Sequence, residues 1–127
     1  MMKHLPTIAR ILLGLLFVFG GVTGLFQLVE QPEVGEAAAA FMGAIMDTGY
    51  LWPVIKVTEI VCGVLLILGM FVPLALVVLA PVALNILLFH VFLEPSGLVF
   101  GLVLLVLGLY TAHQHRESFS GVLKRRA

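Results

Sequence analysis

Two ionisable side chains, Lys56 and Glu59, lie three residues apart in the otherwise apolar stretch 51–69. This stretch is long enough to cross a bilayer, where a charge is costly and is therefore usually paired, turned inward and functional. A spacing of three places both side chains on one face of a helix, close enough to pair. The pair indicates where the protein works. The alternative is an ion pair that only orients the helix, with Lys56 reaching toward water.

Further polar residues are expected at the same depth. Because a helix rises about 1.5 Å per residue, counting from the helix ends places Thr23, Gln27, Asn85 and His90 in the same half of the bilayer as the ion pair. The other half of the bilayer has almost no polar residues. This asymmetry predicts a pocket in the polar half, which is the outer half in the orientation argued below, and the pocket would open toward the outer face or the outer leaflet. Taken singly, Asn85 would be interpreted as a residue that joins two helices, and His90 as an ordinary residue near the interface; it is the set together that favours a functional site.

The chemistry of this set suits a small lipophile with a polar head. Lys56, Asn85 and His90 can donate hydrogen bonds to the carbonyls of a quinone, which is the leading candidate cofactor or ligand. Glu59 and His90 are the candidate catalytic residues, because they can relay protons. The expected ligand-binding residues are Lys56, Asn85, Thr23, Gln27 and Trp52.

No metal site or thiol chemistry is expected from the sequence. His113 and His115 lie two residues apart, so their side chains point away from each other on a helix. The only cysteine, Cys62, cannot form an internal redox pair and is interpreted as a small buried apolar residue.

The composition indicates an integral membrane protein. The chain has 127 residues, 61% hydrophobic and 11% charged, with a mean hydropathy of +1.18, which is too apolar for a soluble domain. Four stretches reach the ~20 residues that a bilayer crossing needs. They cover about 8–28, 51–71, 73–93 and 97–114. Short connections make neighbouring helices antiparallel. We therefore expect one all-α membrane domain, residues 1–127, built as a four-transmembrane-helix antiparallel bundle.

The longest connection has a helical pattern of its own. Residues 33–47 place apolar side chains at helical spacing, but the segment is too short to span. We expect an amphipathic helix that lies flat on the outer interface or folds over the mouth of the bundle. Tyr50 and Trp52 come after it, where an aromatic belt is expected.

The distribution of charge predicts the orientation. Apart from Lys56, every lysine and arginine lies near a terminus: Lys3, Arg10, Arg116 and residues 124–126. The first and third connections carry acidic residues and no basic ones. The positive-inside bias then places both termini, with the basic tail 115–127, in the cytoplasm. No nucleic-acid-binding patch is present.

Small residues predict close helix contacts. Gly97, Gly101 and Gly108 form a stripe on the last helix, and Gly20 and Gly24 form a second stripe on the first helix. Such stripes let two backbones approach closely. They predict a homo-oligomer with the last helix as the contact. The alternative is that both stripes serve packing within one chain.

Four segments resemble the DoxX-like family of small bacterial membrane proteins: ARILLGLLFVFGG (9–21), GYLWPVIKVTEI (49–60), GMFVPLAL (69–76) and LAPVALNILLFH (79–90). The resemblance implies a multi-pass four-helix bundle in the bacterial inner membrane. Family members include a subunit of a thiosulfate:quinone oxidoreductase, proteins linked to quinone stress and thiol redox balance, and chaperone-like or cargo-handling proteins. The family-motif positions in this chain are Lys56, Glu59, Asn85 and His90.

The sequence is compatible with two classes of function. In the first, the chain binds a quinone-like or other small lipophile in a membrane redox system. Electrons would come from a partner subunit or a bound cofactor, since the chain has no redox centre of its own. In the second, the chain is a non-enzymatic scaffold or assembly subunit for a partner protein. The sequence contains no complete catalytic constellation, which leaves both classes open.

Overall fold

The computed structural model describes residues 2–27 and 35–120, and all the secondary structure in these ranges is helical. Four elements are long and apolar enough to span a membrane. They are α1 (Leu5–Phe26), α3 (Leu51–Leu68), α4 (Val72–Phe92) and α5 (Leu98–Gln114), the last preceded by the short helix η2 (Pro95–Gly97). The predicted four-span helical bundle is confirmed. The acidic residues Glu30 and Glu33 and the basic residues 124–126 lie outside the described residues.

Two helix ends fall earlier than the sequence suggested. Helix α1 ends at Phe26 because Gln27 adopts a left-handed conformation (φ 53°) and donates its N–H to the Thr23 carbonyl. Helix α3 ends at Leu68 because Gly69 is also left-handed (φ 74°), a conformation that glycine adopts without steric cost. Helix α1 also begins a few residues earlier than expected, with a proline in its first turn.

Helices α1 and α3 pack closely because glycines face each other across their contact. A methyl group added at Gly14 would lie 2.6 Å from the Gly63 carbonyl oxygen, and one added at Gly21 would lie 2.9 Å from the Lys56 carbonyl. Only a residue without a side chain permits such an approach. Gly24 packs against the stem of Lys56 in the same contact. Gly14, Gly21 and Gly24 therefore serve packing within the chain.

The first two glycines of the second predicted stripe, Gly97 of η2 and Gly101 of α5, also face inward. A methyl group at Gly101 would lie 3.2 Å from the Leu87 Cα atom of α4, and Gly97 contacts the His90 ring. These positions match the alternative that the stripe packs within one chain. Gly108 is different, because nothing lies within 4 Å of an added methyl group. The homo-oligomer remains a prediction, without Gly97 or Gly101 as a free contact surface.

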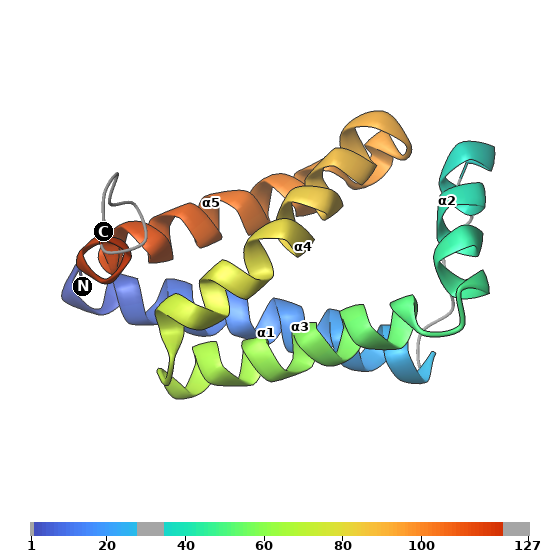
Figure 1. The fold of residues 1–127 in the computed structure, drawn as a ribbon. Coiled ribbons are helices and arrows are strands. Elements are labelled where there is room, and N and C mark those ends of the chain that lie inside the picture. Colours follow the sequence, from blue (N-terminus) through green and yellow to red (C-terminus); the bar gives the residue numbers. More distant parts are fainter. Residues whose placement is uncertain (1, 28–34, 121–127) are drawn as a thin grey trace.

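Helix α2 (Glu36–Asp47) lies across one end of the bundle (Figure 1), which is the second of the two expected placements. The Gly35 N–H, directly before α2, donates to a carboxylate oxygen of Glu94 at 2.8 Å. The rings of Phe41 and Phe89 pack with centroids 5.7 Å apart. These contacts hold α2 over the turn between α4 and α5.

Helix α4 runs diagonally through the bundle (Figure 1). It starts beside the end of α3 and finishes beside the start of α5. One wedge therefore opens between α3 and α4 at the end covered by α2, here called the α2 end. A second opens between α4 and α5 at the opposite end, where α1 begins, here called the termini end. Phe17 and Leu104, both almost fully buried, belong to the core between the two wedges.

Candidate functional site

The first wedge is a cavity of about 650 Å³ lined by α1, α3, α4 and the first turns of α5, with α2 over it. Six of the seven residues that the sequence singled out line this cavity. They are Thr23, Trp52, Lys56, Glu59, Asn85 and His90. Gln27 does not line it, because its left-handed backbone at the end of α1 leaves the side chain exposed. The structure therefore brings the expected polar residues of three helices together.

Lys56 and Glu59 form the expected ion pair. The Lys56 Nζ atom lies 3.4 Å from an oxygen of Glu59, and the side chains are only 14% and 5% exposed. The Lys56 ammonium also lies 4.5 Å from the centroid of the Trp52 ring, so it has a cation–π contact as well. Truncating one member of such a buried pair leaves the other uncompensated, which makes the pair costly to break.

Trp52 connects α3 to α1. Its indole N–H donates to the Gly24 carbonyl at 3.1 Å. The last carbonyls of a helix lack an intrahelical partner, so this hydrogen bond satisfies one of them. The indole is half-buried and lines the cavity, whereas Tyr50, two residues earlier, is exposed as an interfacial aromatic residue would be.

The carboxylate of Glu59 has room beside it. Within the described ranges, its only hydrogen-bond partner is Lys56. Gly20 faces it from α1, and a methyl group at that position would lie 3.8 Å from the Glu59 Oε2 atom. The absence of a side chain at Gly20 keeps this part of the cavity open. The carboxylate can therefore accept a further hydrogen bond or a proton from a ligand.

Asn85 and Thr23 each use one donor on their own helix. The Asn85 amide donates to the Pro81 carbonyl at 3.3 Å, and the Thr23 hydroxyl donates to the Phe19 carbonyl at 2.7 Å. Asn85 retains an amide hydrogen and its oxygen, whereas Thr23 retains only acceptor capacity. Asn85 is therefore the neutral donor best able to reach a ligand from α4.

His90 is held by the turn after α4. Its Nδ1 atom lies 3.0 Å from the Glu94 carbonyl oxygen. A carbonyl can only accept, so Nδ1 carries the hydrogen, and Nε2 of the neutral ring presents a lone pair. The ring packs edge-on against Phe89 and Phe100, with centroids 5.2 and 6.4 Å away. The packing orients the ring, and the hydrogen bond to Glu94 leaves Nε2 as the nitrogen available for proton transfer.

Glu94 anchors the cover of the cavity and was not singled out by the sequence. The Gly35 N–H and then the Ser96 hydroxyl donate to its carboxylate, and these hydrogen bonds hold the pKa of Glu94 below its ordinary value of 4.5. The partner Gly35 lies 59 positions earlier in the chain, so no local pattern predicts the contact.

The rest of the cavity wall is apolar. Helix α2 contributes Phe41, Met42 and Ile45, and α3 to α5 contribute further aliphatic and aromatic side chains. Apolar walls with a few convergent polar groups are typical of sites for small organic ligands. In the part of the chain that the structure describes, no group of three or more histidine, cysteine or acidic residues is arranged to hold a metal ion.

The comparisons with known proteins agree with this architecture. The family model of DoxX matches residues 5–91, which cover α1 to the last residue but one of α4 and include Lys56, Glu59, Asn85 and His90. A search of curated proteins and a search of solved structures found no match. Since the matched segment covers more than half of the 127 residues, this membrane protein belongs to the DoxX family.

Proposed function

We propose that the cavity under α2 binds a small lipophile with a polar head, and that the ligand is a quinone within a membrane redox system. The observation that carries the proposal is the gathering of six polar or aromatic side chains, from three helices, around one cavity with apolar walls. Packing alone does not require three helices to place their polar residues at one site. A volume of about 650 Å³ also lies within the usual range for ligand pockets.

The side chains fit the chemistry of a quinone. The Lys56 ammonium and the Asn85 amide are donors for its two carbonyl oxygens. Reduction to the quinol takes up two electrons and two protons. Glu59 and His90 are the candidates for passing those protons, because both line the cavity and both can carry a proton. The electrons would come from a partner subunit or a bound cofactor.

A non-enzymatic scaffold is the second candidate, and one observation favours it. Lys56 contacts both Glu59 and Trp52, and Trp52 is bonded to the Gly24 carbonyl of α1. The same polar residues therefore hold α3 against α1. A protein that only presents its surface to a partner would also need this rigidity.

Ligand binding is tested by thermal stabilisation of the purified protein with decylubiquinone. At tenfold excess over its dissociation constant, a ligand stabilises the folded state by about 1.4 kcal/mol. Asn85→Leu removes one neutral hydrogen bond, so the quinone should bind roughly three- to tenfold more weakly. The control is Thr58→Val, since Thr58 lies on α3 outside the cavity and its hydroxyl donates to the Val54 carbonyl. Stabilisation that is absent, or equal in both variants, would contradict the quinone site.

Glu59→Gln separates the two classes of function. It keeps the shape of the side chain and removes the charge. A quinone-linked enzyme should lose turnover while any partner complex survives, whereas a scaffold should keep its partner and have no turnover to lose. Glu117→Gln is the matched control, because it removes a carboxylate that is exposed and outside the cavity. Both variants should first be shown to keep the helical content of the wild type.

We place the protein in the bacterial inner membrane with both termini in the cytoplasm. The support is the basic charge near the chain ends and the acidic connections at the opposite end. The cavity under α2 then opens toward the periplasmic side.

A further inference from the structure

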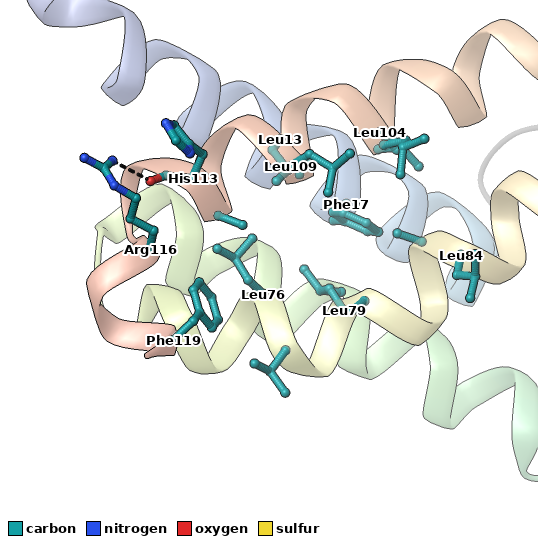
Figure 2. A pocket seen from close by; sticks show the side chains of 16 residues that line it. Leu13, Phe17, Leu76, Leu79, Leu84, Leu104, Leu109, His113, Arg116 and Phe119 are labelled. Atoms are coloured by element: carbon teal, nitrogen blue, oxygen red, sulfur yellow. Dashed lines mark hydrogen bonds between the residues drawn. The ribbon is translucent and has the colours of Figure 1, made fainter. Parts of the chain in front are cut away.

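The second wedge, between α4 and α5, is a cavity of about 500 Å³ at the termini end (Figure 2). It lies on the face of α4 turned away from the first cavity. Ala80 of α4 lines this wedge, whereas Val82 lines the first cavity, and residues two apart on a helix point to nearly opposite sides. Among the described residues, Phe17 and Leu104 alone border both spaces. The wedge is therefore a separate site, and its ligand is independent of the quinone proposed for the first cavity.

The wedge is apolar along its length and basic at one end. Aliphatic side chains of α1, α4 and α5 form its walls, and Phe119 lies beside its mouth (Figure 2). Within residues 2–27 and 35–120, the charged lining residue is Arg116, next to His113, and no carboxylate lines the wedge. An ionic group at one end of an apolar slot is complementary to an amphiphile with an anionic head.

Arg116 is positioned for an anion. Its Nη1 atom donates to the His113 carbonyl at 3.1 Å, which holds the guanidinium at the rim (Figure 2). Across residues 2–27 and 35–120 it forms no salt bridge, because the single ion pair there joins Lys56 and Glu59. Its other N–H groups remain available. A guanidinium binds phosphate oxygens in a planar, often bidentate arrangement.

We propose that this wedge binds an anionic phospholipid, with one acyl chain between α4 and α5 and the phosphate on Arg116. A lipid chain is thin and flexible enough to run along the slot. A helix of a second copy of the chain is thicker, about 10 Å across with its side chains. A cavity of about 500 Å³ has room for roughly one turn of such a helix, so a lipid chain fits it better. The surrounding leaflet also supplies the lipid at high concentration, and basic residues at this depth attract anionic headgroups.

The headgroup contact is tested by native mass spectrometry of the full chain released from bicelles. These contain equal amounts of phosphatidylglycerol and phosphatidylcholine with identical acyl chains. The wild type should retain one phosphatidylglycerol in preference to phosphatidylcholine. Arg116→Gln should lower that preference about fivefold. Lys3→Gln is the control, because Lys3 is an exposed basic residue near the chain start that does not line the wedge.

The acyl-chain slot is tested by filling it. Gly108→Leu places a side chain in the wedge, and nothing lies within 4 Å of the Cβ atom that it adds. It should abolish retention of both lipids. Gly43→Leu is the control, because Gly43 is equally open but lies on α2. If Gly108→Leu loses helical content, Ala80→Leu fills the same slot from the α4 side and decides the test.

Three results would overturn the proposal. The first is equal retention of the two lipids by the wild type, which would mean that ordinary surrounding lipid fills the wedge. The second is an equal preference in Arg116→Gln and Lys3→Gln. The third is a wild-type dimer, free of lipid, that dissociates in the Gly108→Leu variant, which would assign the wedge to a second copy.

Discussion

Gly14→Ala should destabilise the protein, because the close contact of α1 and α3 has no space for a methyl group. The added carbon would lie 2.6 Å from the Gly63 carbonyl oxygen and 2.8 Å from the Ile67 Cγ1 atom. The oxygen belongs to the backbone, so the helices must move apart. Such overpacking lowers the free energy of unfolding by roughly 1–3 kcal/mol. The higher helix propensity of alanine offsets up to about 1 kcal/mol of this loss. The expected net loss is about 1–2 kcal/mol.

Gly108→Ala is the matched control, since its methyl group meets nothing within 4 Å. Only the propensity gain applies there, so this variant should be as stable as the wild type or up to about 1 kcal/mol more stable. Stability is measured by reversible unfolding with sodium dodecyl sulfate in mixed micelles. The fluorescence of Trp52, the single tryptophan, reports directly on the α1–α3 contact. A Gly14→Ala variant as stable as Gly108→Ala would refute the close packing of these helices.

Three other perturbations test the cover of the cavity, the bond between α3 and α1, and the topology. Acidification below pH 4.5 should loosen α2, because the lowered pKa of Glu94 gives stability that is fully present above 4.5 and is lost as pH falls through the folded-state pKa. The measurement is the hydrogen-exchange protection factor at the start of α2, which corrects for the intrinsic exchange rate at each pH; it should fall on acidification in the wild type and should not change with pH in Glu94→Gln. Trp52→Phe should lower the free energy of unfolding by about 0.5–1.5 kcal/mol, because the hydrogen bond to α1 is lost. Thermal unfolding monitored by circular dichroism measures it, and an unchanged melting temperature would show that this hydrogen bond does not stabilise the fold. In a cysteine-free background, a cysteine at position 36 should be labelled by a membrane-impermeant reagent from the periplasm and one at position 124 should not, and the reverse pattern would invert the topology.

The four spans could be predicted because the sequence features that determine them are local. Long apolar stretches separated by turn residues fix both the number of helices and their approximate bounds. The ion pair was predictable for the same reason, since the spacing of Lys56 and Glu59 fixes their relative position on any helix. The predicted end of α1 was too late because Gln27 adopts a left-handed backbone, a conformation that is uncommon outside glycine.

Features that depend on contacts between distant segments could not be predicted. Glu94 holds the start of α2 through a residue 59 positions away, and this contact brings Phe41 and Met42 to the cavity wall. The second wedge exists because α4 crosses the bundle diagonally, and helical periodicity carries no information on the direction of a helix axis. Gly108 shows the difference most clearly. Its sequence context suggests a packing stripe, whereas its surroundings are open.

The diagonal course of α4 also explains why one cavity is polar and the other is not. The first wedge is bounded by the face of α3 that carries Lys56 and Glu59 and by the face of α4 that carries Asn85. The second wedge is bounded by the opposite face of α4 and by α5, which contribute aliphatic side chains up to His113, and Arg116 follows α5 at the rim. Between them, Phe17 and Leu104 are 3% and 1% exposed, so the two spaces do not merge. A ligand head in the first cavity and an acyl chain in the second therefore occupy different volumes and need not compete.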